Sequence, residues 1–253
     1  MVLNRFHALV AVLVLARSAV AQTSPLDRLR GNRAGEIILV GMEAMGGWEA
    51  WKRKSTVRYD RDSTRYEADG RAILEKQLHE FDLPPAVRIR QETVRDGKRI
   101  VTGFDGSKAW VTEDGKPVTG EARLQGARNS SFGTQFMFCV PFKLVEEVAR
   151  YEHLGTVKLE GAEYDKVRVT YPPGAGDNPD QIWVFYFNRA THLMTRADWS
   201  NAAGTSHSIS EYDDFRKFDG LLWPARRTNY ERKPDGGRGR KLTELVYRNI
   251  RFN

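Results

Sequence analysis

The chain has 253 residues, with 40 Lys and Arg against 33 Asp and Glu, a formal net charge of +7 at pH 7 and 40% hydrophobic residues. Its basic residues alternate with acidic ones, as in Arg58-Tyr59-Asp60-Arg61-Asp62. This pattern is typical of a solvated surface and argues against a nucleic-acid partner, while a weak contact with anionic membrane surfaces stays open. The single cysteine, Cys139, excludes an intramolecular disulfide, and its apolar neighbours indicate a buried residue rather than a nucleophile.

Residues 1–21 have the features of a cleavable secretory signal peptide. Arg5 is followed by a nine-residue apolar run over 8–16, and Ala19-Val20-Ala21 supplies the small residues of a cleavage site. The run is too short for a transmembrane helix, which needs about 20 apolar residues. The alternative is a buried N-terminal helix.

We therefore expect cleavage between Ala21 and Gln22 and a periplasmic or secreted location. The remaining residues, 22–253, show no linker or internal repeat and are expected to form one domain. Removing residues 1–21, which hold two arginines and no acidic residue, lowers the formal net charge from +7 to +5.

A helix is expected at the start of the mature chain. Ser24 is a good N-cap and Pro25 suits the first helical position. The predicted apolar face consists of residues at helical spacing, namely Ile37, Ile38, Gly41, Met42 and Met45. Gly46-Gly47 ends this helix, and residues 48–51 fit one further turn.

After Ser55 the pattern changes to short strands rich in β-branched and aromatic residues. The expected strands cover residues 56–59, 64–68, 73–81, 87–94, 99–104 and 108–112. Asp-Gly pairs at 96–97, 105–106 and 114–115 are turn signals between them.

Residues 120–154 lack such turn signals. A helix is expected to begin at Pro141, with Phe142, Val145, Val148 and Ala149 on one face, and to end at Gly155. The segment 121–128 is compatible with a further helical stretch.

Strands return after residue 155. They are expected at residues 156–159, 164–171, 181–188, 193–199, 206–215, 222–231 and 241–252. Residues 182–187 are apolar on both faces, which predicts a central strand with cover on each side. This succession of strands with short turns predicts a mainly β fold with a few helices and one meandering antiparallel sheet.

Four groups of segments, in order along the chain, carry a resemblance to a known family, namely Met45–Trp51, Pro84–Glu92 with Phe104–Trp110, Phe187–Met194, and Tyr212–Arg216 with Asp219–Pro224. Together they resemble the LolA/LolB-like superfamily of periplasmic lipoprotein carriers and its uncharacterised relatives. The resemblance implies an open, incomplete β-barrel covered on its concave face by an N-terminal helix and a mid-chain helical segment. In the carriers, an apolar cavity between sheet and helices takes lipid acyl chains.

The function expected from this resemblance is that of an exported, non-enzymatic, monomeric protein without a cofactor. It would bind an apolar ligand, such as lipid acyl chains or a lipoprotein. The residues predicted to line the cavity are Ile37, Ile38, Met42 and Met45 in the first helix and Phe136, Phe138 and Phe142 in the middle segment. The alternative is that all seven fill a packed core.

Motifs for catalysis or metal binding are not found in the sequence. His79, His153, His192 and His207 show no metal-ligand spacing, and there is no phosphate-binding loop, nucleophile elbow or dinucleotide fingerprint. Two other functions stay open: a structural or envelope-assembly protein that holds a partner, and a hydrolase whose residues converge only in space. A pocket that joins His79 or His207 to a carboxylate and a serine would favour the hydrolase.

Overall fold

The computed structural model describes residues 24–145, 149–172 and 181–253. The predicted signal peptide over residues 1–21, its cleavage site and Val148 lie outside the described residues. In the described part, no helix is both long enough and apolar enough to cross a membrane.

The described strands belong to one antiparallel sheet. Its first half contains β1 (Thr56–Tyr66), β2 (Ala72–Asp82), β3 (Ile89–Arg95), β4 (Lys98–Phe104), β5 (Ala109–Glu113) and β6 (Lys116–Pro117). Its second half contains β7 (Arg150–Leu159), β8 (Ala162–Thr170), β9 (Gln181–Asn188), β10 (Met194–Asn201), β11 (His207–Phe218), β12 (Leu221–Arg232) and β13 (Arg238–Phe252).

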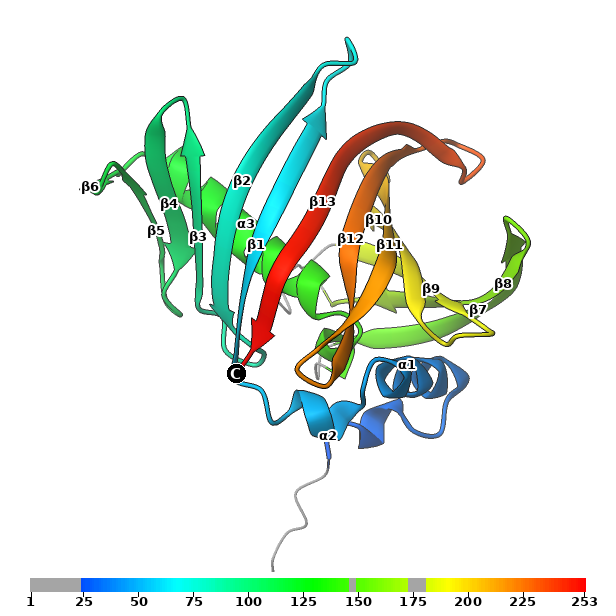
Figure 1. The fold of residues 1–253 in the computed structure, drawn as a ribbon. Helices are drawn as coiled ribbons and strands as arrows, with labels where there is room; N and C mark the ends of the chain where they lie inside the picture. The colour runs from blue at the N-terminus through cyan, green and yellow to red at the C-terminus, as the bar shows by residue number, and fades with distance from the viewer. Residues whose placement is uncertain (1–23, 146–148, 173–180) are drawn as a thin grey trace, which may run out of the picture.

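The thirteen strands follow the order β6-β5-β4-β3-β2-β1-β13-β12-β11-β10-β9-β8-β7. Each half is a meander of neighbouring hairpins, and the pairing of β1 with β13 joins the two halves. The sheet curls around a central helix, while β6 and β7 stay apart as its two edges (Figure 1). The predicted fold class, an open and incomplete β-barrel with a few helices, is confirmed.

The hairpin turns form where the sequence predicts them. Asp96 and Gly97 between β3 and β4 both have positive φ, at 53° and 75°. A two-residue hairpin turn needs such angles to match the right-handed twist of the strands it joins. The two strands expected at 56–59 and 64–68 are a single strand, β1. Its charged middle section pairs residue by residue with β2, which keeps these polar residues in the ladder.

The N-terminal helix begins later than expected. A 3-10 turn, η1 (Asp27–Leu29), precedes α1 (Arg33–Ala44), so the predicted start at Ser24 is wrong. The cap is Asn32, whose side chain accepts a hydrogen bond of 2.8 Å from the Gly35 amide. The short α2 (Trp48–Trp51) follows, and α1 packs against β7 and β8 at one end of the barrel (Figure 1).

The mid-chain helix lies earlier than expected. It is α3 (Glu121–Cys139), followed by the 3-10 turn η2 (Phe142–Val145), so the prediction of a helix beginning at Pro141 is wrong. The residue before a proline is driven to extended backbone, and Val140 has φ −64° and ψ 143°. Pro141 therefore ends the helix, and Gly155 lies inside β7 at a register shift between His153 and Thr156.

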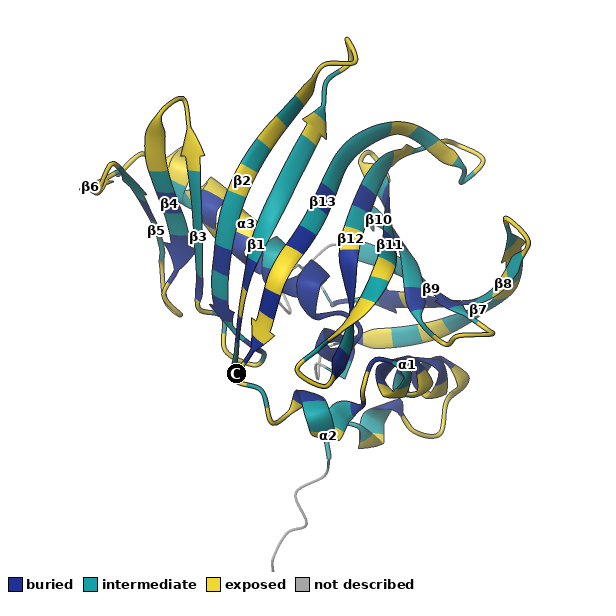
Figure 2. Cartoon of the chain, viewed as in Figure 1, coloured by how far each residue is buried: buried dark blue, intermediate teal, exposed yellow. Residues whose placement is uncertain are grey.

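The core lies between α3 and the inner, concave face of the sheet. Strand residues alternate between buried and more exposed at the start of β1 and in the C-terminal half of β13, as Figure 2 shows for β13. An aromatic cluster fills the end of the barrel near α2, where the rings of Trp51 and Phe142 stack at 4.6 Å and those of Tyr59 and Phe138 stack at 4.6 Å. These contacts join α2 to η2 and β1 to α3.

Strand β9, predicted from residues 182–187 to be central, is an interior strand that pairs with β8 and β10 and lies third from the β7 edge. Its inner face is apolar. On its outer face, the Tyr186 hydroxyl donates to Asp198 Oδ2 at 2.9 Å, and the Arg196 guanidinium lies 4.8 Å from the Tyr186 ring centroid. The polar contacts with Asp198 and Arg196, together with the Tyr164 ring at 6.5 Å, therefore cover Tyr186 on the outer side of this aromatic strand.

Candidate ligand-binding cavity

A cavity of about 650 Å³, which is the main, inner cavity of the protein, lies between α3 and the inner face of the second half of the sheet. From α3 it is lined by Arg128, Asn129, Phe132, Gly133, Phe136 and Met137. From β9 to β13 it is lined by Gln181, Trp183, Trp199, Ser208, Ser210, Arg227, Asn229, Leu242 and Thr243. Its volume is within the range of roughly 300–1,000 Å³ found for small-molecule sites.

The cavity has one aromatic wall and one polar wall. On the aromatic side, the Trp183 ring lies 5.1 Å from Phe136 and 6.4 Å from Trp199. On the polar side, Ser210 Oγ donates to Asn229 Oδ1 at 2.6 Å, and the Asn229 amide donates to Thr243. A ligand with both an apolar and a polar part would match these two walls.

The orientation of α3 is fixed by hydrogen bonds to the first half of the sheet. The Gln135 side-chain amide donates to the carbonyl oxygens of Asp82 at 2.8 Å and Ala86 at 2.7 Å. Gln135 is fully buried, so these bonds are shielded from water and hold the helix in one rotation. This rotation turns Gly133 and Phe136 toward the cavity.

Gly133 keeps part of the cavity open. No neighbouring atom lies within 4 Å of the position that a Cβ would take there, and the same is true of Gly126 earlier in the same helix. A glycine inside a helix costs about 0.5–1 kcal/mol relative to alanine. Gly133 faces the cavity, whereas Gly126 is exposed and does not line it.

Positive charge gathers on the inner face beside the cavity. Arg227 on β12 lines the cavity, and Arg61 on β1 donates from Nε to Gln77 Oε1 at 2.8 Å. Among the described residues, neither arginine lies within ion-pair distance of a carboxylate. Burial raises the pKa of the Tyr59 and Tyr212 phenols, so these neighbouring groups stay neutral and do not balance the charge.

His79 is part of this inner face and is fully buried. Its Nε2 lies 3.2 Å from Gln77 Oε1, and its ring stacks on Tyr59 at 5.0 Å. Burial first, and then the charges of Arg61 and Arg227, hold the pKa of His79 well below its ordinary value, so the ring is neutral.

The arrangement that would favour a hydrolase is not seen in the described residues. His79 is in contact with an amide and a phenyl ring, and His207 is exposed at the start of β11. Within residues 24–145, 149–172 and 181–253, no group of three His, Cys, Asp or Glu side chains could hold a metal ion.

The structure places the seven predicted ligand residues in different surroundings. Phe136 lines the cavity. Phe138 and Phe142 lie in the aromatic cluster, each against Trp223. The residues from the first helix region are also buried, with exposed fractions of 7% for Ile37, 0% for Ile38, 1% for Met42 and 1% for Met45.

Sequence reasoning did not single out most of the residues that line the cavity. Trp183 could have been found from strand alternation, because it shares a face with Phe185 and Phe187, which are buried. Arg227 could have been found from the adjacent pair Arg226-Arg227, since neighbouring strand residues face opposite sides and one of the two must point inward.

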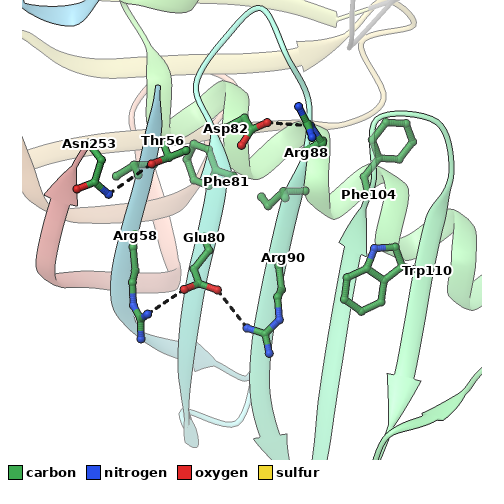
Figure 3. Close-up of a pocket in the computed structure, with 12 residues that line it drawn as sticks. Thr56, Arg58, Glu80, Phe81, Asp82, Arg88, Arg90, Phe104, Trp110 and Asn253 are labelled. Atoms are coloured by element: carbon green, nitrogen blue, oxygen red, sulfur yellow. Dashed lines mark hydrogen bonds and ion pairs between the residues drawn. The ribbon is translucent and has the colours of Figure 1, made fainter. Parts of the chain in front are cut away.

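A second hollow, the outer hollow, has a volume of about 500 Å³ and lies over β1 to β5 (Figure 3). It is lined in part by a row of charged side chains in which Glu80 lies between Arg58, at 3.0 Å, and Arg90, at 3.4 Å. Trp110 lies at one side of this row and covers Gly103, where a Cβ would come within 2.7 Å of the indole ring. By strand alternation, Glu80 and the two arginines are on the outer face, opposite His79.

No protein-family model matches the chain, and no curated protein sequence matches it significantly. Solved structures do resemble it. A LolA superfamily protein from Nitrosomonas europaea has a TM-score of 0.57 and 12% sequence identity, covering 87% of this chain and 93% of that one. A DUF1329 family protein from Desulfovibrio piger has a TM-score of 0.58 and 12% identity, with the same coverage of both chains.

A putative outer membrane lipoprotein-sorting protein domain from Vibrio parahaemolyticus has a TM-score of 0.50 and 13% identity, covering 84% of this chain and 92% of that one. These likenesses extend over most of the described chain, and they concern the fold, since the identities are low. The open antiparallel sheet curled around α3 is thus the fold of LolA superfamily proteins.

Proposed function

We propose that this chain is an exported, non-enzymatic protein that binds the acyl chain of a lipid or of a lipidated protein in the cavity between α3 and the sheet. The observation that carries the proposal is the cavity itself, with its aromatic wall of Phe136, Trp183 and Trp199 and the open space beside Gly133. The similarity to LolA superfamily structures supports it at the level of fold.

The aromatic wall accounts for the affinity. Each methylene group that leaves water for such a surface contributes about 0.8 kcal/mol, so a chain of several methylenes gains enough to bind without any covalent chemistry. Apart from Arg128 and Arg227, the polar groups of the described lining are uncharged and several are paired with one another, which suits reversible binding rather than catalysis.

The proposed location is the periplasm or the exterior, reached after cleavage between Ala21 and Gln22. The short apolar run over residues 8–16 supports this location. We propose that the mature chain, residues 22–253, acts as a single monomeric domain without a cofactor and makes at most weak contacts with membrane surfaces.

The test uses two glycines of the same helix. In Gly133→Leu, the new side chain enters the cavity, whereas in Gly126→Leu it enters solvent. Both substitutions should raise stability by about 0.5–1 kcal/mol, because leucine is a better helix former than glycine. Only Gly133→Leu should abolish saturable binding of a fluorescent fatty acid.

Native mass spectrometry of the exported protein should in addition find a lipid bound to the parent and to Gly126→Leu, and none bound to Gly133→Leu. Equal probe binding by both leucine variants would contradict the assignment of the cavity. Measuring the urea midpoint of each variant confirms that the difference is not caused by unfolding.

A second function is favoured by one observation. Six of the seven predicted ligand residues do not line the main cavity but lie buried elsewhere, so much of the interior is filled. A protein that holds a partner on its surface would need no internal ligand. In this case, the parent protein would show no saturable probe binding and no bound lipid after mild purification.

A further inference from the structure

The charged residues that line the main cavity are all of one sign. Arg128 and Arg227 are the charged members of its described lining, and no Asp or Glu accompanies them there. Arg128 is exposed at the rim, with its guanidinium 4.6 Å from the Phe132 ring centroid. Arg227 lies deeper, on the polar wall with Asn229.

Arg227 has an unused donor. Its Nε is buried and has no hydrogen-bond partner among the described residues. Its cross-strand neighbour on β11 is Tyr212, a phenol and not a carboxylate. Burying part of a guanidinium without a counter-ion costs free energy, and an anion bound in the cavity would offset this cost.

On the outer face of the same strand pair, an arginine is neutralised by a carboxylate. Arg226 precedes Arg227 and points to the other side, where its Nε lies 2.5 Å from Asp213 Oδ1. The inner arginine lacks such a partner although a carboxylate could have occupied position 212 across the strand pair. Arg61, one strand beyond β13, adds a further positive charge to this inner face.

We infer that the ligand of this cavity is an anionic amphiphile, with a carboxylate or phosphate headgroup bound by Arg227 and an alkyl chain against Phe136, Trp183 and Trp199. This inference rests on the proposed function and specifies its ligand class. The headgroup would lie on the polar wall, where Asn229 and Ser210 are also within the lining. A guanidinium matches both headgroups, because it presents its donors as a planar fork.

The test compares dodecanoate with dodecanol at about pH 8, where the carboxyl group of the acid is ionised. Dissociation constants are measured for the parent, Arg227→Gln, Arg227→Lys and the control Arg226→Gln. The parent and the control should bind dodecanoate about 10- to 100-fold more tightly than dodecanol, as expected for one charge-assisted contact. Arg227→Gln should lose this preference and bind dodecanoate and dodecanol with similar dissociation constants.

Arg227→Lys should keep part of the preference, because it retains the charge and loses the fork. Dodecyl phosphate should follow dodecanoate in every variant, and inorganic phosphate should compete only weakly, because it has no chain to bury. Retained dodecanol binding shows that the variant is folded and its cavity intact.

A parent that binds acid and alcohol equally would overturn the inference and leave the proposed function standing, whereas a parent that binds neither would overturn the proposed function. A preference that survives in Arg227→Gln would assign the headgroup to another residue and also overturn the inference. Inorganic phosphate binding as tightly as dodecyl phosphate would indicate a site for small anions instead.

Discussion

The inner cavity and the outer hollow both contain arginines, and they differ in what surrounds those arginines. In the outer hollow, Arg58 and Arg90 share Glu80 at 3.0 and 3.4 Å. In the inner cavity, Arg227 has a buried Nε without a described partner. Paired charges on an exposed face add little stability, whereas an unbalanced charge in a cavity would be stabilised by a bound anion.

The two regions also differ in their space. In the outer hollow, the Trp110 ring covers Gly103, so a Cβ at that glycine would collide with the indole. At Gly133 in the inner cavity, the corresponding space is empty. The inner cavity is therefore the region where an added side chain tests function, and the outer hollow is the region where changes should have small effects.

The largest effect is expected where the interior is filled instead of hollow. Met42 is 1% exposed and does not line the main cavity, so Met42→Ala should lower the free energy of unfolding by about 2–5 kcal/mol. Affinity for a fluorescent fatty acid should be unchanged in the folded fraction. A urea titration checks the first value, and probe binding in buffer checks the second.

A small stability loss with a clear loss of probe binding would instead place Met42 at the ligand. This outcome would extend the binding region from the main cavity to α1 and would weaken the distinction between filled core and open cavity.

The second prediction concerns the positive inner face. His79 has a depressed pKa in the folded protein, while in the unfolded chain its pKa is near the usual ~6.5. Below about pH 6.5 the unfolded chain therefore binds a proton that the folded protein does not, and stability should fall by up to ~1.4 kcal/mol per pH unit. This part of the stability is fully present above pH ~6.5 and is lost as the pH falls toward the folded pKa.

Chemical denaturation between about pH 7 and 5 should show this slope in the parent and a smaller slope in His79→Gln. His207→Gln, at an exposed position on β11, is the matched control and should behave as the parent does. An unchanged slope in His79→Gln would mean that the buried ring is not excluded from protonation.

The smallest effect is expected at the outer hollow. Glu80→Gln removes the shared partner of Arg58 and Arg90, and because these side chains are in contact with solvent the cost should be about 0–1 kcal/mol. Binding of dodecanoate should be the same as in the parent. A large loss of binding from this substitution would move the ligand to the outer face.

The fold could be predicted well from the sequence because its signals are local. Asp96-Gly97 specifies a hairpin turn, and alternating strand residues specify which side is buried. In the middle of the chain, residues 121–128, which are compatible with a helix by sequence, do lie in α3, whereas the helix expected to begin at Pro141 is wrong. The full length of α3 is hard to predict because its pattern is only weakly apolar, with polar residues such as Ser130 and Gln135 whose side chains bond to β3 and β2. By sequence Pro141 fits the start of a helix, whereas in the structure it ends the helix before it.

The candidate site was harder to predict. Phe136 can be singled out as an aromatic residue in an apolar segment. The role of Arg227, in contrast, depends on which residue of β11 lies opposite it in the sheet. Sequence alone does not tell whether an arginine has a carboxylate opposite it, since that depends on the register of two strands. The open space at Gly133 likewise depends on the rotation of α3, which Gln135 sets from β2 and the following loop.

The most direct measurement is a crystal structure of the mature protein with ω-bromododecanoic acid, located by the anomalous signal of bromine. We expect a bromine site between α3 and β9–β10, against Phe136 and Trp183, with the carboxylate at Arg227. A bromine site over Trp110 in the outer hollow, with the inner cavity empty, would show that the inner cavity is not the ligand site.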